Sequence, residues 1–338
     1  MAHRFPGHPY YIPIIKWQAW EQRALLQTRG DVKPYICPCI EIRHSDQHNS
    51  LIGNFQTVWG APALVDYANP AGRLVGVRLL EFAAFLQVAK ANRLPIIPVI
   101  NPLDVSLLNP TLLGQVQSFP EIYLRLRINV LAISHEQYSQ TMMAAQALST
   151  SGNRIHLMID FGVTPAWEPP ELNAFAGTVA AFKHAGFRQI HVASGAFPES
   201  LAAVKAVAIL PRRDWALWAA LNTIASTLCL GYSDYGTISP RWTEETLMRR
   251  GGRVAIRYAR PLDWLVLRAD GNKSEHSVAI STLMVTVHAA SFKGRAYSYG
   301  DELIADRPNP AIKKKNAGLF HFTEGWCHHL ATVIKEQY

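Results

Sequence analysis

The sequence predicts an α/β fold, a (β/α)8 barrel of the TIM type, and three observations support this prediction. First, six short apolar runs of strand-forming residues each end at a polar or ionisable side chain. Second, helix-like stretches lie between most of these runs. Third, a chain of 338 residues is long enough for one barrel with additions. The six runs are Cys39–Glu41, Leu64–Asp66, Val99–Asn101, Leu124–Arg127, Met158–Asp160 and His191–Ser194.

The barrel strands are expected to follow one another along most of the chain. An apolar run at residues 11–15 comes before them, and a helix-like stretch follows it to Leu26. Residues 43–60 are polar and are expected to form a long loop. The strand at 94–101 contains two prolines, each of which removes a ladder donor. The strands are expected at residues 35–42, 61–66, 94–101, 121–127, 155–160, 189–194, 226–231 and 253–258.

Apolar spacing and capping residues predict the helices. The stretch 79–91 carries apolar residues at helical spacing. Ser134 is expected to begin a helix that runs to about Leu148, and Pro169 begins a helix that ends before Gly186. Further helices are expected at residues 199–210 and 214–222.

We expect a single domain over residues 1–338, because no Ser- or Gly-rich linker interrupts the chain. The barrel is expected at residues 30–260, with an N-terminal segment before it. Residues 261–338 are expected to form a C-terminal α+β elaboration packed on the barrel. Its expected parts are an extended segment at 261–269, a helix or strand at 277–290 and a late helix within 311–335.

The composition bounds the partners and the compartment. The formal net charge of +8 favours anionic partners such as phosphates or nucleic acid, although solubility alone would also explain it. With 49% apolar and 17% charged residues, a large core is expected. The four cysteines lack the spacing of a redox pair or zinc site, so we expect reduced thiols in a cytoplasmic protein. No apolar run reaches the roughly 18 residues of a membrane span, and no membrane partner is expected.

Three carboxylates at strand ends are the first candidates for chemistry. Glu41, Asp66 and Asp160 end three of the predicted strands, and such ends converge on one mouth of a barrel. Together they would suit a divalent cation such as Mg²⁺, or they would divide into a general acid and a general base. The alternative is that they cap the following helices or pair with arginines.

Two arginines and one serine add anion-binding candidates. Arg125 and Arg127 are two residues apart on one strand, so both side chains lie on the same face. Inside the barrel they would bind an anionic substrate or phosphate, and facing the helices they would form structural ion pairs. Ser194, before Gly195, lies in a turn that exposes backbone N–H groups to an anion, or it is a plain tight turn.

Near the C-terminus, His328 and His329 form a doublet in a helix-like run. Adjacent helical residues point about 100° apart, so the two cannot easily bind one metal ion; one of them is a candidate for the site, and the other for packing or capping. The run Lys313–Lys315 is a surface loop or a nucleic-acid contact. The sequence contains no Walker A motif, dinucleotide fingerprint or zinc ligand set.

The segment Tyr232–Pro240 resembles the "GDYG…P" segment of the phage beta-protein family. The similarity covers essentially the whole chain, in the same order. The chain departs from the family pattern at Ser233, where the family usually has Gly, and at Ala259, where it usually has Thr. The further matching segments are Tyr11–Lys16 with Glu21, Pro38–Ile42, Ile256–Tyr258 with Trp264, Tyr299–Asp301 and Gly325–His329.

This resemblance implies a setting in phage–host conflict or mobile elements, such as antiviral defence, and supplies no mechanism. It marks five positions for testing, which are Asp234, Tyr235, Tyr258, Asp301 and His329.

Two hypotheses of function follow. The first is an enzyme acting on a phosphate-bearing substrate, such as a nucleotide or a nucleic-acid end. Its catalytic residues would be Glu41, Asp160, Arg125, Arg127 and His329, and its substrate-binding residues Lys16, Asp66, Ser194, Asp234, Tyr235 and Tyr258. The second is a non-catalytic module that binds a partner protein or a phage component through aromatic anchors, with Trp59, Trp167, Trp242 and Trp326 as candidates. An open polar mouth favours the first hypothesis, and a mouth plugged by the C-terminal part favours the second.

Overall fold

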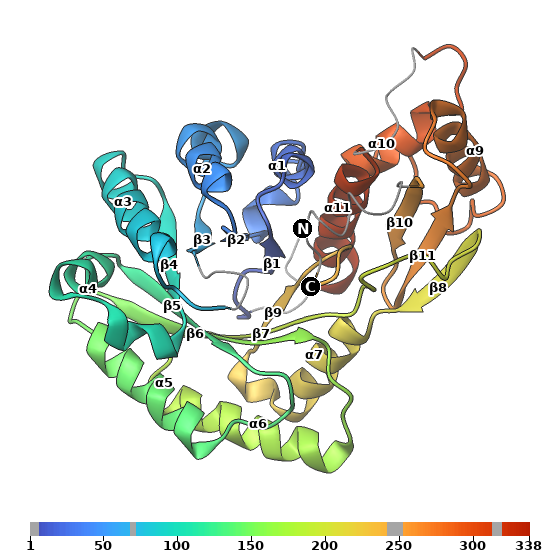
Figure 1. The fold of residues 1–338 in the computed structure, drawn as a ribbon. Coiled ribbons are helices and arrows are strands. Elements are labelled where there is room, and N and C mark those ends of the chain that lie inside the picture. The colour runs from blue at the N-terminus through green and yellow to red at the C-terminus, as the bar shows by residue number, and fades with distance from the viewer. Residues whose placement is uncertain (1–6, 68–71, 242–252, 313–319) are drawn as a thin grey trace.

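The computed structural model describes residues 7–67, 72–241, 253–312 and 320–338. Eight parallel strands close into a barrel in the order β1-β2-β3-β4-β5-β6-β7-β9, which confirms the predicted fold class (Figure 1). The barrel strands are β1 (Ile12–Ile15), β2 (Cys39–Glu41), β3 (Ala63–Asp66), β4 (Ile96–Ile100), β5 (Glu121–Arg127), β6 (Arg154–Val163), β7 (Ile190–Gly195) and β9 (Gly231–Asp234).

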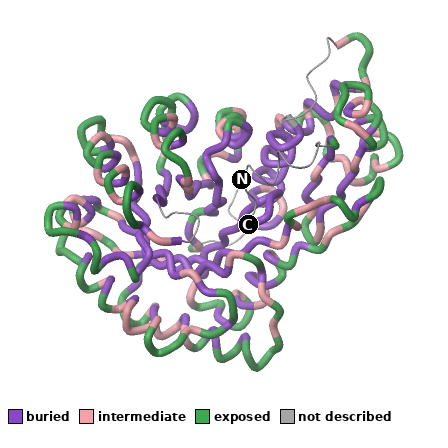
Figure 2. Tube along the Cα trace, viewed as in Figure 1, coloured by how far each residue is buried: buried purple, intermediate pink, exposed green. Residues whose placement is uncertain are grey.

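Helices cover the outside of the barrel, and their apolar faces pack on the strands. Figure 2 shows the buried residues along the barrel wall and the exposed residues on the outer sides of the helices. Among the described residues, no helix is long and apolar enough to cross a bilayer. The covering helices are α1 (Ala19–Leu26), α2 (Ser45–Val58), α3 (Val77–Ala91), α4 (Pro110–Gln117), α5 (His135–Leu148), α6 (Pro169–His184), α7 (Arg213–Ile224) and α11 (Phe320–Thr332), with the short helices η1 (Lys33–Tyr35), η2 (Pro102–Leu107) and η3 (Ser226–Leu228) in the connections.

The alternation of side chains along each strand decides what fills the barrel. Ile14, Cys39, Leu64 and Met158 belong to one buried cluster inside the barrel, whereas their chain neighbours face the helices. This interior layer is apolar and lies below the carboxyl ends of the strands. The polar residues at the strand ends therefore lie directly above a closely packed apolar layer.

The first and last barrel strands differ from the prediction. The run at residues 11–15, which was placed before the barrel, forms β1 and pairs with both β2 and β9. The segment 226–231, expected as a strand, instead begins with the short helix η3, and the closing strand β9 starts only at Gly231. The segment 253–258, expected as the eighth barrel strand, belongs to the second sheet. The sequence does not indicate β9 as a strand, because β9 has little apolar character. Its polar residue Ser233 is nevertheless buried, and its hydroxyl donates a hydrogen bond to the carbonyl of Ile12. A strand whose buried side chains are polar and hydrogen-bonded within the fold cannot be predicted from the spacing of apolar residues.

Two further segments were predicted wrongly. Residues 45–58 form helix α2 instead of a loop, because Leu51, Phe55 and Val58 make a narrow buried stripe in a polar segment. The segment 199–210, expected as a helix, ends in strand β8 (Val207–Pro211). Short edge strands with alternating exposure are easily confused with amphipathic helices.

The C-terminal part adds a second, antiparallel sheet in the order β10-β11-β8. Strand β10 (Ala255–Ala259) pairs with β11 (Asp263–Arg268), and β11 pairs with β8, which the chain inserts between β7 and α7. Helices α9 (Ser274–Val285) and α10 (Tyr299–Asp306) follow, and α11 then packs between the barrel and β10 (Figure 1). Because α11 also packs against α1, it takes the place of the barrel's eighth helix. A π-helical turn, η4 (Val333–Gln337), ends the chain.

Candidate active site

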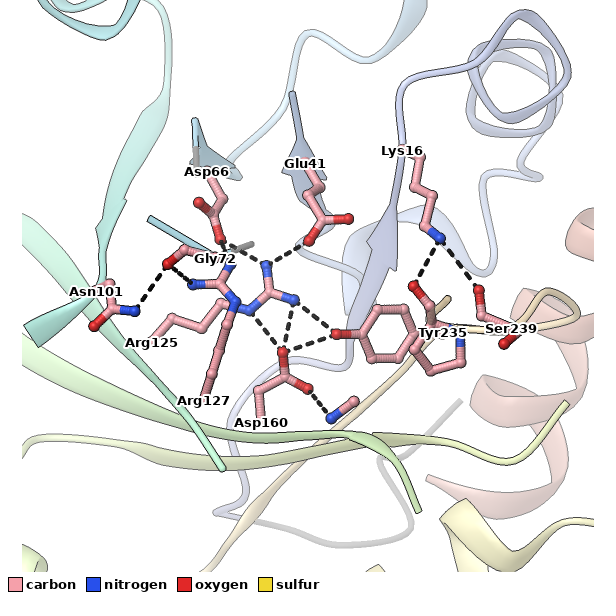
Figure 3. A network of polar contacts seen from close by, with 12 residues as sticks. Lys16, Glu41, Asp66, Gly72, Asn101, Arg125, Arg127, Asp160, Tyr235 and Ser239 are labelled. Atoms are coloured by element: carbon pink, nitrogen blue, oxygen red, sulfur yellow. Dashed lines mark hydrogen bonds and ion pairs between the residues drawn. The ribbon is translucent and has the colours of Figure 1, made fainter. Parts of the chain in front are cut away.

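Strand register brings a cluster of ionisable side chains together at the carboxyl ends of the strands. Glu41 on β2 lies opposite Asp66 on β3, and Arg127 on β5 lies opposite Asp160 on β6. Arg125 lies two residues before Arg127 and points to the same side. Figure 3 shows these side chains converging in the barrel mouth, joined by polar contacts.

The buried guanidinium of Arg125 is the centre of this cluster. Its Nη1 donates to Oδ2 of Asp66 at 2.6 Å and to Oε1 of Glu41 at 3.3 Å. Its Nε and Nη2 both donate to Oδ2 of Asp160, at 3.0 and 2.8 Å. Burial would lower the pKa of this guanidinium, but Tyr235 and the carboxylates around it raise the pKa well above its usual value. Arg125 therefore remains charged and offsets part of the negative charge of the three carboxylates that surround it.

Asp160 is fully occupied by donors. Besides Arg125, the hydroxyl of Tyr235 donates to its Oδ2 at 2.8 Å, and the backbone N–H of Gly162 donates to its Oδ1 at 2.9 Å. Burial and the neighbouring Asp160 raise the pKa of Tyr235 well above its usual value, so this hydroxyl keeps its proton. These donors, all from the protein itself, contact both oxygens of the carboxylate. We therefore assign Asp160 to charge balance.

Arg127 lies at the rim and holds the loop after β3. Its Nη2 donates to Oδ2 of Asp66 at 2.6 Å, and its Nη1 donates to the carbonyl of Gly72 at 3.3 Å. Gly72 has a φ of 77°, and a Cβ there would lie 2.7 Å from Cδ of Arg127. Only glycine fits this close approach. Asp66 thus bridges both arginines through Oδ2.

An open pocket of about 490 Å³ lies above this cluster. Its wall includes Glu41 and Asp160 and three arginines from different strand ends and loops, which are Arg43, Arg127 and Arg241. Among the described residues of the mouth, four arginines (Arg43, Arg125, Arg127 and Arg241) stand against three carboxylates (Glu41, Asp66 and Asp160). Such a surface attracts anionic ligands.

Glu41 is the carboxylate in this pocket with the fewest partners. Its single contact to Arg125 is the long one of 3.3 Å through Oε1. Within the described part of the chain, no donor contacts its Oε2, and the side chain keeps 13% of its surface exposed. A carboxylate with one oxygen facing a pocket is placed to accept or donate a proton.

Lys16 follows β1 and lies beside the mouth without exposed surface. Its Nζ donates to the carbonyls of Ser239 and Pro240 at 3.2 and 3.0 Å. Burial lowers its pKa to about 8, against the opposite effect of Glu41. Lys16 thus adds positive charge near the pocket without reaching into it.

Asp234 and His329, by contrast, do not lie in the mouth, which corrects the expectation for both. Asp234 precedes the inward-facing Tyr235 by one residue, so its side chain points to the outside of the barrel wall. There its carboxylate accepts from Tyr11 at 2.6 Å, from Tyr232 at 2.7 Å and from Nε2 of His329 at 2.8 Å. His329 lies on α11 and is fully buried. Burial would raise the pKa of Asp234, but His329 and the neighbouring Arg212 lower it below its usual range.

The buried cluster of Asp234, Tyr11, Tyr232 and His329 joins α11 to β1 and β9, and we expect it to stabilise the fold. The change His329→Ala removes a hydrogen bond to a buried carboxylate and should lower the free energy of unfolding by about 1.5–3 kcal/mol. Urea denaturation measures this loss, and ligand binding at the pocket should stay unchanged. A loss of binding at unchanged stability would return His329 to the site.

Tyr258 and Ser194 also lie outside the mouth. Tyr258, on β10, donates to Oδ1 of Asp301 at 2.7 Å and stacks on His328 in the C-terminal part. Ser194 faces away from the barrel interior, because its neighbour Ala193 points inward. It accepts a hydrogen bond from Thr164, which lines the pocket, at 3.0 Å. Ser194 therefore supports the pocket wall from behind.

The three carboxylates do not form a cation site. The guanidinium of Arg125 takes the place between Glu41, Asp66 and Asp160 that a divalent cation would need. Over the described ranges, no group of three or more His, Cys, Asp or Glu side chains is arranged to hold a metal ion. The donor set therefore does not fit Mg²⁺.

Three of the four candidate aromatic anchors lie within the described residues, and none of these three is exposed. Trp59 and Trp326 are buried, and Trp167 is half-buried beneath Arg213. Trp242 and the run Lys313–Lys315 lie outside the described residues.

The family model for the Beta protein matches residues 11–335. The chain belongs to the Beta protein family. This finding confirms the resemblance seen in the sequence motifs. No curated protein matches this Beta protein. A solved structure described as "The crystal structure of AsfvAP:AG" aligns at 11% identity with a TM-score of 0.33, over 98% of this chain and 99% of that chain. A TM-score this low supports no inference about the reaction.

Proposed function

We propose that this Beta protein is an enzyme that acts on a phosphate-bearing substrate, a nucleotide or a nucleic-acid end, at the barrel mouth. The observation that carries this proposal is the open pocket in which three arginines surround a carboxylate with a free oxygen. Arginine binds phosphate oxygens through paired N–H groups, and a pocket with excess positive charge favours such a ligand.

The residues divide into three roles in this proposal. Arg127 and Arg241 bind the phosphate and stabilise the charge that develops during the reaction. Glu41 exchanges a proton with the substrate or with an attacking water. Arg125, supported by Asp160 and Tyr235, fixes Glu41, and Asp66 fixes Arg127.

The setting is part of the same proposal. The family resemblance supports a role in phage–host conflict, such as antiviral defence, and the reduced cysteines support a cytoplasmic location. We treat residues 1–338 as a single domain, since α11 joins the C-terminal part to the barrel.

Isothermal calorimetry with a ligand panel tests the proposal. The panel contains nucleoside mono-, di- and triphosphates, pyrophosphate and a short oligonucleotide with a 5′-phosphate. At least one ligand should bind, and Arg127→Met should weaken it about tenfold or more, as expected for lost hydrogen bonds to a charged group. Arg154→Met is the matched control, because Arg154 pairs with Glu121 on the surface with 58% of its side chain exposed. A stable protein partner and no bound panel member would favour the non-catalytic module instead.

Anion binding should depend on pH through Lys16. Below its pKa of about 8, Lys16 is charged and attracts an anion, and above it this attraction is lost. The charged groups that face Lys16 are Glu41, Arg43, Glu21 and Arg125. Of these, Glu21 has a pKa that burial raises to about 7, so Glu21 is largely ionised from pH 7.5 upward and changes little over the range tested. Sulfate, whose charge is constant here, should bind about threefold or more weakly at pH 9.5 than at pH 7.5. The change Lys16→Met should flatten this dependence, and an equally steep curve for the variant would contradict the assignment.

A further inference from the structure

The turn after β1 holds an unfavourable backbone conformation next to the pocket. Trp17 has a φ of 52°, in the left-handed region that non-glycine residues rarely adopt. It directly follows Lys16, and both residues are buried. Such strain persists only where the surroundings fix the chain, and it is frequent at functional sites.

Side chains from two helices fix this turn. Oε2 of Glu21, on α1, accepts from the backbone N–H groups of Lys16 at 2.9 Å and of Gln18 at 3.0 Å. Nε2 of Gln22 donates to the carbonyl of Trp17 at 2.9 Å, and Nε2 of Gln47, on α2, donates to the carbonyl of Lys16 at 2.8 Å. Both the N–H and the carbonyl of Lys16 are therefore held by hydrogen bonds, which fixes the position and direction of its Cα–Cβ bond.

The side chain of Lys16 then crosses to the loop after β9. Its Nζ donates to the carbonyl oxygens of Ser239 at 3.2 Å and of Pro240 at 3.0 Å. Figure 3 shows the Lys16 side chain directed at this loop, where Ser239 is labelled. An ammonium group, with three donors and no acceptor, can serve two successive carbonyls at once. The loop that receives it carries Arg241, whose backbone N–H donates to Oγ of Ser239 at 3.2 Å.

The opposite side of this loop is held by close packing on β7. A Cβ at Gly195 would lie 2.6 Å from Cγ of Pro240, so Pro240 lies directly on the glycine. Pro240 is thus fixed between Lys16 and Gly195. Both Pro240 and Arg241 line the pocket, whereas Lys16 is not part of its wall.

We propose that Lys16 is a positioning residue, which locks the loop 239–241 as one wall of the pocket and so sets Arg241 against the anionic group of the substrate. This replaces the expectation that Lys16 itself binds substrate. The nature of the ligand rests on the proposed function, whereas the locking of the loop does not.

Hydrogen–deuterium exchange in the absence of ligand tests the locking. The change Lys16→Met should speed exchange in a peptide covering residues 231–241, because the loop loses the donor that holds two of its carbonyls. Lys33→Met is the matched control, since Lys33 also donates from Nζ to a backbone carbonyl, that of Trp59 at 2.7 Å, away from the pocket. The control should leave this peptide unchanged. Unchanged exchange in Lys16→Met would overturn the proposal.

A double-mutant cycle with sulfate as the probe tests the action through Arg241. In the parent chain, Lys16→Met should weaken sulfate binding about tenfold. In an Arg241→Ala background it should weaken binding no more than about threefold, which is the effect of the lost charge alone. Equal losses in both backgrounds would show that Lys16 acts independently of Arg241 and would overturn the proposal.

A second variant approaches the same loop from its other side, which keeps the test valid should Lys16→Met fail to fold. Gly195→Ala places a methyl group against Pro240 and should also speed exchange in residues 231–241 and weaken sulfate binding, with Lys16 intact. Should no anion bind the parent chain while Lys16→Met still speeds exchange, the locking role stands and the proposed function fails.

Discussion

Arg125→Met should be the most destabilising single change in the barrel, lowering the free energy of unfolding by about 3–5 kcal/mol. The guanidinium contacts Glu41, Asp66 and Asp160, and its removal leaves these carboxylates together without their shared cation. The buried hydroxyl of Tyr235 also loses a donor, at 2.9 Å. Urea denaturation followed by circular dichroism measures the loss.

The control for this prediction is again the surface pair of Arg154 and Glu121, where Arg154→Met should change the free energy by less than about 1 kcal/mol. Acid should partly rescue the Arg125 variant, because protonation removes the repulsion among the carboxylates. A variant as stable as the parent chain would mean that the buried ion cluster does not support the barrel mouth.

Glu41→Gln should reduce turnover of the phosphate-bearing substrate by about a hundredfold or more, with stability nearly unchanged. The amide keeps the shape of the side chain and the contact to Arg125, but it cannot exchange a proton. The measurement is the initial rate on the substrate that the ligand panel identifies, together with the melting temperature of both proteins.

Asp160→Asn is the informative comparison for Glu41. Because Asp160 is bonded to Arg125, Tyr235 and Gly162, its change should lower stability as well as activity. A Glu41→Gln protein with full activity, or one that unfolds as readily as the Asp160 variant, would refute the proton-transfer role of Glu41.

The sequence predicted the middle of the barrel well and its two ends poorly, for a physical reason. Strands such as β5 and β6 each contain an apolar run, residues 122–124 and 157–159, that makes them visible in the sequence. The closing strand β9 has the sequence Gly-Tyr-Ser-Asp, whose polar side chains are bonded to β1 and to α11. Those bonds come from residues far away in the chain, and no local pattern reports them.

The same distinction applies to the site. The two-residue period of a strand was enough to place Arg125 and Arg127 on one face, and the strand ends were enough to bring Glu41 and Asp160 beside them. The family motif, however, marked both Asp234 and Tyr235, and only the register of β9 decides that Tyr235 faces inward. Arg43 lies two residues after Glu41, so the same two-residue period places it on the side of Glu41. Arg241 lies in a loop, where no such period applies.

The most direct test of a phosphate-binding site at the barrel mouth is a crystal structure with the tightest ligand of the panel. The proposal predicts the phosphate group in the pocket of about 490 Å³, within hydrogen-bond distance of Arg127 and Arg241 and beside Glu41. A ligand bound elsewhere, for example in the groove between α5 and α6 near Met142 and Phe187, would contradict it.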